Sequence, residues 1–239
     1  MVEQGDPMML KEIAGVTGIN ASTALRMIKT MMLCGYVRKD PRTQRYMLTL
    51  KFAKIGHAVE SRYSIADIVK PPMLECSRNC GEAVCFATER EMEVLYLFSF
   101  DSPTGNLRVT HTVGDVAPLH TAGIGKIMML NYSDADLDRY IRIKGLQKFT
   151  KNTIRTKKKM VAELEKIRLA EYSVDNEESE IGIRSIAVGI RNYEGKYIGG
   201  VSVPGPISRI TEDRIPAIVA ELRKTAALIA EDVFHMDSV

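Results

Sequence analysis

The chain has 239 residues, 45% of them hydrophobic, which suits one large domain or a small domain followed by a medium one. It contains no run of about 18 apolar residues, so we expect no membrane-spanning helix, and its acidic start lacks the apolar block of a secretory signal. The four cysteines do not follow a secreted disulfide framework, and we therefore expect reduced thiols in a cytoplasmic protein.

The net charge of +3 is unevenly distributed along the chain. Residues 1–63 hold ten Lys or Arg and five Asp or Glu, a net charge of +5, whereas residues 64–239 have a net charge of −2. Within residues 20–63 the balance is nine against two, or +7. A basic N-terminal part is typical of a protein that meets a polyanion, although a solvated basic face would have the same composition.

Two short helices are predicted near the start. Apolar residues recur with helical spacing over residues 9–16, MLKEIAGV, and Gly18 then supplies the backbone freedom of a tight turn. Asn20 is suited to cap a second helix that runs to about residue 33. The buried face of that helix is expected at Ala24, Met27, Ile28 and Met31. The positions expected to face DNA, where hydroxyls and cations can bond phosphates or base edges, are Ala21, Ser22, Thr23, Leu25, Arg26 and Lys29.

A basic hairpin is predicted directly after the second helix. Residues 35–40 and 45–50 have the pattern of two short strands, joined by a turn at residues 41–44. Arg38, Lys39, Arg42 and Arg45 would lie along the DNA backbone or in the minor groove. Two helices, a glycine turn and a basic hairpin in this order predict a winged helix-turn-helix. The alternative is a helical pair and hairpin used only for protein contact.

A connecting helix is predicted over residues 50–63. Phe52, Ile55, Gly56, Val59 and Tyr63 form one stripe along it. This stripe can pack on its own domain, or it can form the seam between two subunits.

The remainder of the chain alternates between strands and helices, which predicts an α+β sensor domain. The first helix there carries Pro71 and Pro72, which favour a kink. The expected helices are residues 65–80, 120–132, one capped by Ser133, 157–170 and one from Thr211 to about 234, and the expected strands are 82–89, 92–100, 106–113, 184–192 and 196–204.

Small residues suggest where a ligand would lie in this domain. On one face of residues 184–192 are Ser185, Ala187 and Gly189, and Ser202 on the next strand lies roughly opposite Ser185 if the hairpin is tight. The helix that follows His120 would direct backbone N–H groups into this space, which favours an anion. Small residues can equally serve close packing of a helix on the sheet.

Other chemistry is disfavoured. The GIGK segment at residues 123–126 lacks the flanking residues of a phosphate-binding loop, because positions 120 and 127 are His120 and Ile127. Cys76, Cys80 and Cys85 fall short of a metal-ligand set, so buried thiols are favoured and no metal is expected. The acidic run at residues 175–180 has no nucleophile or histidine beside it and is expected to be solvated or structural. We therefore expect neither an enzyme nor a cofactor.

Several segments resemble the IclR family of bacterial transcription regulators, with spacing closest to its KdgR-like members. They are residues 9–40 and 45–56, which hold the two helices, the hairpin and the start of the connecting helix, GDVAPLHTAGIGKIMM at residues 114–129, YSVDNEESEIGIRSIAVGI at residues 172–190 with its DxxE pair, and GVSVPGPISRIT at residues 200–211. The resemblance implies a winged helix-turn-helix domain over residues 1–50, a linker helix over 51–63 that helps two subunits pair, and a GAF-like (profilin-like) effector domain over 64–239.

The resemblance also implies a function. It indicates a repressor that binds double-stranded operator DNA as a homodimer or homotetramer and responds to a small carboxylate, a sugar acid or 2-oxo acid. Carried over by position, the effector contacts are Val109, Ala117, Gly123, Ile124, Asp175, Ile183, Ser185 and Ser202.

The sequence departs from the family pattern in four places. The helix that usually precedes residue 9 has little chain to form it, and Glu171, Ser185 and Pro204 replace the usual residues. The shortened start leaves open a ligand-sensing or partner-binding protein whose N-terminal domain does not bind DNA. Pro204 removes a hydroxyl that the family often has in the effector site.

Overall fold

The computed structural model describes residues 7–52, 54–55, 65–102 and 111–234. The chain divides into two compact units, Met1–Ser64 and Ile65–Val239, which we call the head and the body. No helix within the described residues combines the length and hydropathy that crossing a bilayer requires.

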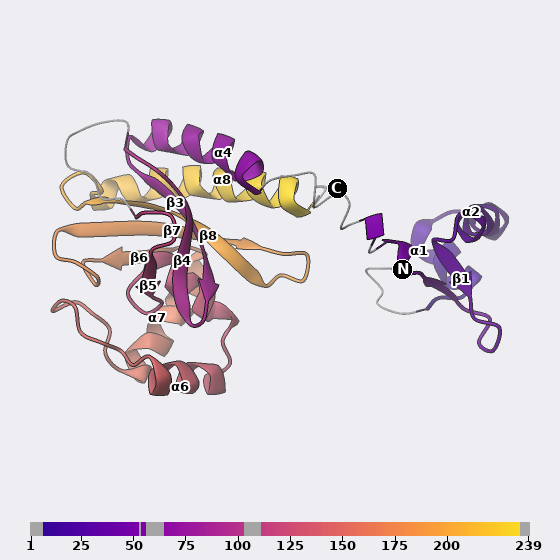
Figure 1. Cartoon of the computed structure of the whole chain (residues 1–239), viewed down its shortest axis with the longest axis horizontal. Coiled ribbons are helices and arrows are strands. Elements are labelled where there is room, and N and C mark those ends of the chain that lie inside the picture. The colour runs from indigo at the N-terminus through magenta and orange to yellow at the C-terminus, as the bar shows by residue number, and fades with distance from the viewer. Residues whose placement is uncertain (1–6, 53, 56–64, 103–110, 235–239) are drawn as a thin grey trace. The chain divides into compact units, whose positions relative to one another are not determined.

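The head contains the expected helix pair and hairpin (Figure 1). Helix α1 spans Leu10–Thr17 and helix α2 spans Ala21–Leu33. Between them Gly18 has φ 67°, the left-handed conformation that glycine adopts without strain. The side chain of Asn20 caps α2 by accepting the N–H of Thr23 at 2.8 Å. Strands β1, Val37–Lys39, and β2, Tyr46–Leu48, pair antiparallel.

The head has a small core. Its buried cluster consists of Met8, Ile13, Ile28, Val37 and Tyr46. Ala24 and Ile28 of α2 are buried as expected. The prediction that Met27 belongs to the buried face is wrong, because α1 and the hairpin cover only a narrow stripe of α2 and leave Met27 53% exposed.

Only the start of the predicted linker helix lies within the described residues. Residues 51–52 and 54–55 are helical, whereas Gly56, Val59 and Tyr63 lie outside the described part. The ring of Phe52 contacts Tyr36 of the head with centroids 5.2 Å apart. Phe52 and Ile55 are nevertheless 40% and 41% exposed, so this end of the stripe is only partly covered by its own domain.

The body is built on one antiparallel sheet of six strands in the order β5-β4-β3-β8-β7-β6. The strands are β3 Val84–Arg90, β4 Glu93–Phe100, β5 Val116–Pro118, β6 Ser173–Asn176, β7 Ile183–Arg191 and β8 Tyr197–Pro206. Of these, β5 and β6 were not predicted, because both are short, with three and four residues. Most of the strand predicted at residues 106–113 lies outside the described part of the chain.

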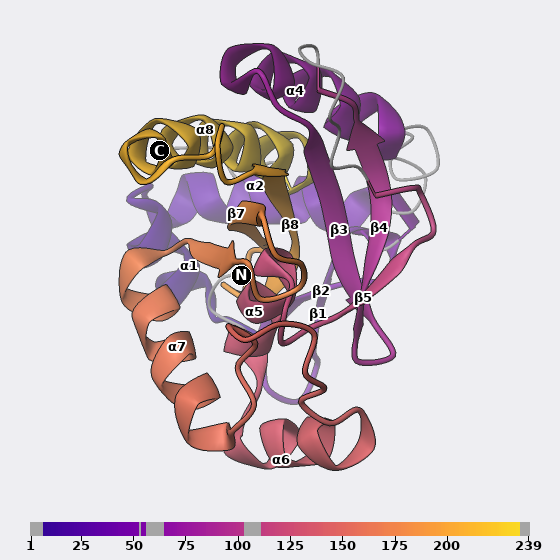
Figure 2. The ribbon, with the colours of Figure 1, turned by 90° about the vertical axis from the view of Figure 1, so that its left-hand side faces the viewer.

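Helices cover both faces of the sheet (Figures 1 and 2). Helices α4 and α8 lie on one face and α5, α6 and α7 lie on the other, so each face has its own apolar core. Their bounds are α4 Ile65–Cys80, α5 Gly123–Met128, α6 Asp134–Ile143, α7 Lys157–Ala170 and α8 Ile215–Phe234, with 3₁₀ turns at Met129–Asn131 and Glu212–Arg214. The α+β prediction is confirmed, although α5 is shorter than expected and α8 begins after Thr211.

The register of the β7–β8 hairpin differs from the expected one. Ser202 lies opposite Ala187, and Ser185 lies opposite Pro204. The offset arises because a longer loop and a β-bulge after Ile190 lie between the two strands. Since opposed residues in an antiparallel pair share a face, all four side chains belong to the face covered by α5.

Candidate functional site

The N-terminal half of α2 presents most of the residues expected to meet DNA. Ala21, Ser22, Arg26 and Lys29 are exposed, and Thr23 and Leu25 are half-buried. Within the described residues no carboxylate pairs with Arg26 or Lys29. An exposed helix whose basic side chains have no carboxylate partner, next to a hairpin, has the geometry of a helix that reads nucleic acid.

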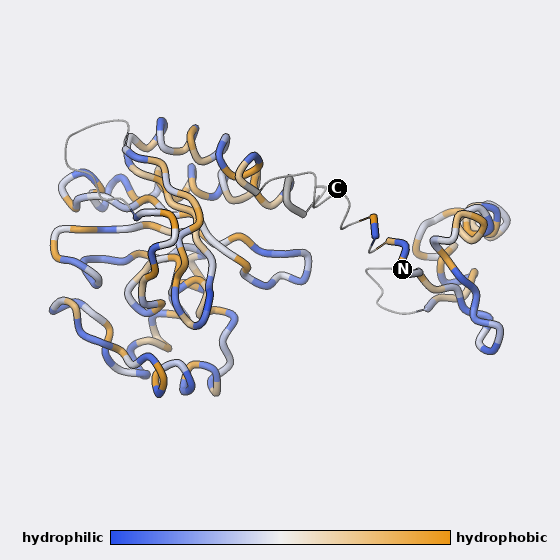
Figure 3. Tube along the Cα trace, in the orientation of Figure 1, coloured by the Kyte–Doolittle hydropathy of each residue, from blue (hydrophilic) through white to orange (hydrophobic). Residues whose placement is uncertain are grey.

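The two hairpin arginines lie in different environments. Arg42 is exposed in the hydrophilic turn between β1 and β2 (Figure 3). That turn is held by Asp40, whose carboxylate accepts the N–H of Arg42 at 2.7 Å, and these backbone hydrogen bonds lower the pKa of Asp40. Arg45 instead pairs with Glu12 at 3.2 Å and donates to the carbonyl of Pro7 at 2.7 Å. Its guanidinium therefore ties the hairpin to α1.

The body contains a cavity of about 220 Å³ on the face of the sheet covered by α5. Five of the predicted effector residues line it, namely Ala117, Gly123, Asp175, Ile183 and Ser185. Ile124 and Ser202 are buried close by, 1% and 3% exposed, and do not line it. Val109 lies outside the described residues. The remaining lining residues are Tyr96, His111, Pro118, Thr121, Ala122, Phe149, Ser179, Glu180 and Pro204.

Helix α5 approaches the sheet closely because its first residue has no side chain. A Cβ at Gly123 would lie 3.1 Å from the Cβ of Ala187 and 3.2 Å from the hydroxyl of Ser173. The Ser173 hydroxyl donates to the Gly123 carbonyl at 2.7 Å. The close-packing interpretation of these small residues is therefore correct for Gly123, and the same approach brings the start of α5 to the cavity wall.

The aromatic part of the cavity was missed from the sequence. His111 stacks on Tyr96 with ring centroids 3.8 Å apart and planes 11° apart. Burial lowers the pKa of His111, against the opposing charge of Asp115, and raises the pKa of Tyr96. These residues and Phe149 come from separate segments, and no spacing along the chain marks them as neighbours.

The DxxE pair is structural and buried. The Asp175 carboxylate accepts the N–H of Glu178 at 2.7 Å and the hydroxyl of Ser179 at 2.5 Å. Burial raises the pKa of Asp175, and the hydrogen bond from Ser179 partly offsets this. Asp175 thus stabilises the turn after β6, and it also lines the cavity.

Glu178 forms an ion pair inside the body with Lys126, which is completely buried. The ammonium group of Lys126 contacts the Glu178 carboxylate at 2.5 Å, the carbonyl of Val174 at 2.7 Å and Glu163 at 3.4 Å. Burial raises the pKa of Glu178 to about 7, against the opposing effect of Lys126. The second Glu178 oxygen, Oε2, is buried without a hydrogen-bond partner in the described structure. Sequence reasoning considered Lys126 only as part of a phosphate loop and missed this role.

Three of the cysteines are buried in the body. Cys76 and Cys80 lie on α4 with sulfur atoms 4.0 Å apart, and Cys85 lies on β3 beside Ser99. Among the described residues no group of three His, Cys, Asp or Glu side chains is arranged to hold a metal ion.

Comparisons with known proteins agree with this architecture. Residues 57–231 match the family described as bacterial transcriptional regulator IclR C-terminal, and residues 2–41 match the IclR helix-turn-helix domain. The HTH-type transcriptional regulator KdgR of Escherichia coli (strain K12) is 30% identical over 230 residues, which cover 95% of this chain and 86% of that protein. The DNA-binding transcriptional repressor YiaJ of the same strain is 28% identical over 226 residues, covering 94% and 80%.

Solved structures give the same result. The crystal structure of the Thermotoga maritima IclR aligns with a TM-score of 0.65 and 28% identity over 95% of this chain and 92% of that chain. The relatives are transcription regulators and not enzymes. With the helix-turn-helix in the head, the cavity in the body and both family matches together, the chain belongs to the IclR family of DNA-binding bacterial transcription regulators.

Proposed function

We propose that this regulator is a cytoplasmic, sequence-specific repressor whose operator binding is controlled by a small carboxylate metabolite, a sugar acid or a 2-oxo acid. The observation that supports control by a ligand is the cavity beneath α5, because five of the residues expected to contact an effector line it. The carboxylate class rests on the family resemblance and on the polar groups around that cavity.

In the head, α2 would enter the major groove with Arg26 and Lys29, assisted by Ala21, Ser22, Thr23 and Leu25. Arg42 would contact the phosphate backbone from the hairpin turn, and Arg45 would support the hairpin from behind. Fluorescence anisotropy with a duplex from the gene's own upstream region tests this. Affinity should fall steeply as salt rises, because phosphate contacts release counterions. Failure to bind that duplex at low salt contradicts the proposal.

In the body, the carboxylate would take the backbone N–H groups of Gly123 and Ile124, which belong to the first turn of α5 and lack helical partners. Ser185 would bond a second ligand oxygen and Asp175 a ligand hydroxyl. Ala117, Ile183 and Val109 would form the apolar wall, with Ser202 supporting it from below. Pro204, which lines the cavity opposite Ser185, offers no hydroxyl, so the ligand needs few polar groups on that side.

Calorimetry of the full chain against a panel of 2-oxo acids and sugar acids tests the cavity. Gly123 is a poor site for a blocking substitution, because any side chain there would displace α5 from the sheet. Ser185→Val instead narrows the cavity and removes a hydroxyl, and Ser208→Val is the matched control on an exposed serine that does not line it. A tight ligand whose affinity is the same in both variants would place the effector site elsewhere.

We further propose the division into residues 1–50, 51–63 and 64–239 and a homodimer or homotetramer. One short reading helix contacts few bases, and pairing two heads on a two-fold operator solves this. The partly exposed Phe52 and Ile55 are candidates for the seam between subunits. Sedimentation that finds only a 26.7 kDa species at micromolar concentration contradicts the assembly.

A second candidate is a sensor or partner-binding protein whose head does not bind DNA. The observation that favours it is the apolar surface of the head, where Val16, Met27 and Leu33 are 57%, 53% and 89% exposed. The duplex-binding experiment separates the two candidates, because only the first requires operator affinity.

A further inference from the structure

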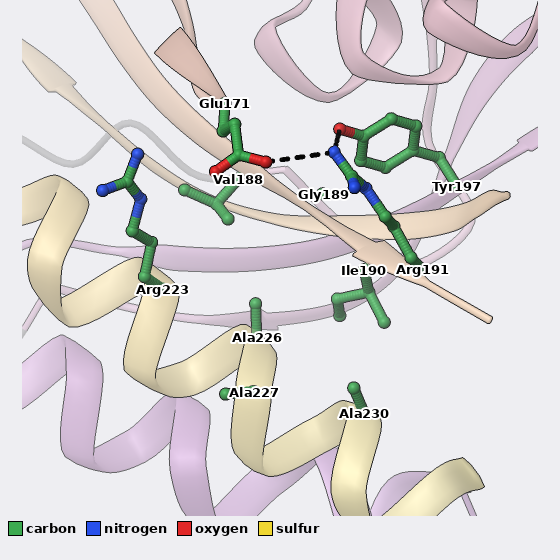
Figure 4. Close-up of a pocket in the computed structure, with 10 residues that line it drawn as sticks. All are labelled: Glu171, Val188, Gly189, Ile190, Arg191, Tyr197, Arg223, Ala226, Ala227 and Ala230. Carbon is green, nitrogen blue, oxygen red and sulfur yellow. Dashed lines mark hydrogen bonds and ion pairs between the residues drawn. The ribbon is translucent and has the colours of Figure 1, made fainter. Parts of the chain in front are cut away.

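A groove of about 300 Å³ lies beside the end of β7 that β6 does not pair with, between this part of β7 and α8 (Figure 4). Its strand wall is a run of four consecutive residues of β7, from Val188 to Arg191. Its helix wall is part of α8, where Ala226 and Ala227 are adjacent and Ala230 lies one turn further along. The groove shares none of its lining residues with the cavity beneath α5.

The floor and walls of the groove are apolar. Val188 and Ile190 are 6% and 2% exposed and belong to the core between the sheet and α8. The three alanines leave space where larger side chains would fill it, and Figure 4 shows Ala226 and Ala230 pointing from α8 toward β7. A volume of 300 Å³ is at the lower end of the range of about 300–1,000 Å³ typical of small-molecule pockets.

Charged side chains stand around this apolar floor, and they carry a surplus of positive charge. Arg191 contacts the Glu171 carboxylate at 3.3 Å and donates to the hydroxyl of Tyr197 at 2.5 Å (Figure 4). Gly189 permits the Tyr197 ring to lie there, since a Cβ at that position would fall 2.3 Å from the ring. One carboxylate therefore neutralises one of the two arginines that line the groove.

The second arginine, Arg223, is held in place without an acidic partner in the described structure. It donates a hydrogen bond at 2.9 Å to the carbonyl of Ala170, at the C-terminal end of α7. The single carboxylate nearby in the groove lining, Glu171, pairs with Arg191. A positioned guanidinium with remaining N–H donors beside an apolar floor is complementary to a carboxylate with a hydrocarbon tail.

We infer that this groove binds a small amphipathic carboxylate, as a site separate from the effector cavity. The hydrocarbon part lies on the alanines of α8 and on Val188 and Ile190, and the carboxylate binds Arg223. The groove and the effector cavity both use β7, because Ile183 and Ser185 line the cavity and the residues from Val188 onward line the groove. A ligand in the groove therefore contacts the strand that forms the cavity wall.

Octanoate is a suitable probe, with 1-octanol as the uncharged probe of the same length. Calorimetric titration of the full chain should show binding of octanoate and weaker binding of octanol. Arg223→Gln should weaken octanoate binding about fivefold to tenfold, because one charge-assisted hydrogen bond is lost. Arg142→Gln, an exposed arginine of α6 outside the groove, is the matched control and should leave the affinity unchanged.

Two variants within the groove and one outside it test where octanoate binds. Ala227→Leu fills the groove from an exposed helical position and should abolish octanoate binding while the thermal unfolding of the body stays the same. Glu171→Gln removes the competing carboxylate and should tighten binding. Ser185→Val, in the effector cavity, should have no effect on octanoate, so the result does not depend on the proposed effector.

The inference is overturned if octanoate does not bind, if octanol binds equally well, or if Ala227→Leu leaves the affinity unchanged. If octanoate fails to bind and Ala227→Leu also changes the sedimentation coefficient, the groove has a different role. That outcome would identify the groove as a contact between copies of this chain.

Discussion

The head and the body both carry polar groups for recognition, and they hold them in opposite ways. In the head, Arg26 and Lys29 lie exposed on one helix, and their neighbours along the chain are also their neighbours in space. In the body, Asp175 and Ser185 come together with Gly123 only because a sheet and a helix bring distant segments to one cavity. A surface that reads DNA can be recognised from local sequence, whereas a cavity depends on strand order and register.

The two regions also differ in how they are stabilised. The head depends on one small apolar cluster around Ile28 and Tyr46. The body has an apolar core on each face of its sheet and, in addition, the buried ion pair between Lys126 and Glu178. Substitutions should therefore affect the two units separately, and the following predictions test that separation.

The largest effect is expected for Lys126→Met in the body. Removal of the cation leaves Glu178 as a buried charge without compensation, which should lower the free energy of unfolding by about 3–5 kcal/mol at pH 8. Denaturation of the full chain in urea, followed by circular dichroism, measures this. Lys148→Met, an exposed lysine in the loop before α7, is the control and should change stability by less than about 0.5 kcal/mol.

The same variant should depend on pH in a defined direction. Glu178 has a folded pKa of about 7, above the ordinary value of 4.5, and loss of Lys126 raises it further. A raised folded pKa means that the folded state favours the protonated carboxyl, so the associated stability is fully present below pH 4.5 and is lost as the pH rises through the folded pKa. The defect should be small at pH 5 and large at pH 8, and a defect independent of pH would contradict burial of the charge.

Next in size is Ile28→Ala in the head. Truncation of this 5% exposed side chain should destabilise the head by about 3 kcal/mol through lost burial and a residual cavity. The unfolding transition of the body should not move. Met27→Ala on the same helix is the matched control and should cost less than about 1 kcal/mol, because Met27 is exposed. Equal losses in the two variants would mean that Met27 is covered in the assembled protein.

A third comparison lies within the head. Arg26→Gln should weaken operator binding by about 1–3 kcal/mol if this side chain reads a base, with no loss of stability. Arg45→Gln should instead lower the stability of the head and have less effect on operator affinity, because its guanidinium is bonded to Glu12 and Pro7 and contributes to the fold. Anisotropy titrations and thermal melts of both variants decide the assignment, and a large affinity loss for Arg45 alone would reverse it.

The smallest effect is expected at the helix cap. Asn20→Ala removes the acceptor of the Thr23 N–H and should destabilise the head by about 1 kcal/mol. Ser22→Ala is the control, since its exposed hydroxyl only donates to the Asn20 side chain and should contribute a few tenths. Thermal melts of the two variants should therefore differ, and identical melting temperatures would show that α2 is held by packing alone.

The sequence was informative wherever the signal was local. The N-cap at Asn20, the left-handed Gly18 and the limits of α7 follow from neighbouring residues, and the structure confirms them. The β7–β8 register was not accessible, because a loop and a bulge set it, and the expected partner of Ser185 was replaced by Pro204. Strand β6 was missed because SVDN reads as a polar segment when its partner strand is unknown.

The candidate site shows the same limit. Glycine and serine positions near the cavity could be named in advance, since small residues on one strand face leave space. The stacked pair of His111 and Tyr96 could not, because each residue is ordinary in its own segment and acquires a role only through the fold. Lys126 could not be placed either, since a lysine inside a helix is expected to face solvent.

The buried cluster of Lys126, Glu178 and Glu163 constrains how this protein can change over generations. Loss of Lys126 leaves Glu178 as an uncompensated charge in the interior, and loss of Glu178 leaves Lys126 with the more distant Glu163 alone, whereas replacement of Lys126 and Glu178 by apolar side chains of similar volume can be neutral or stabilising. The route between those two acceptable sequences passes through an unstable intermediate. Positions 126 and 178, which are 52 residues apart, are therefore energetically coupled, and we expect them to be substituted together.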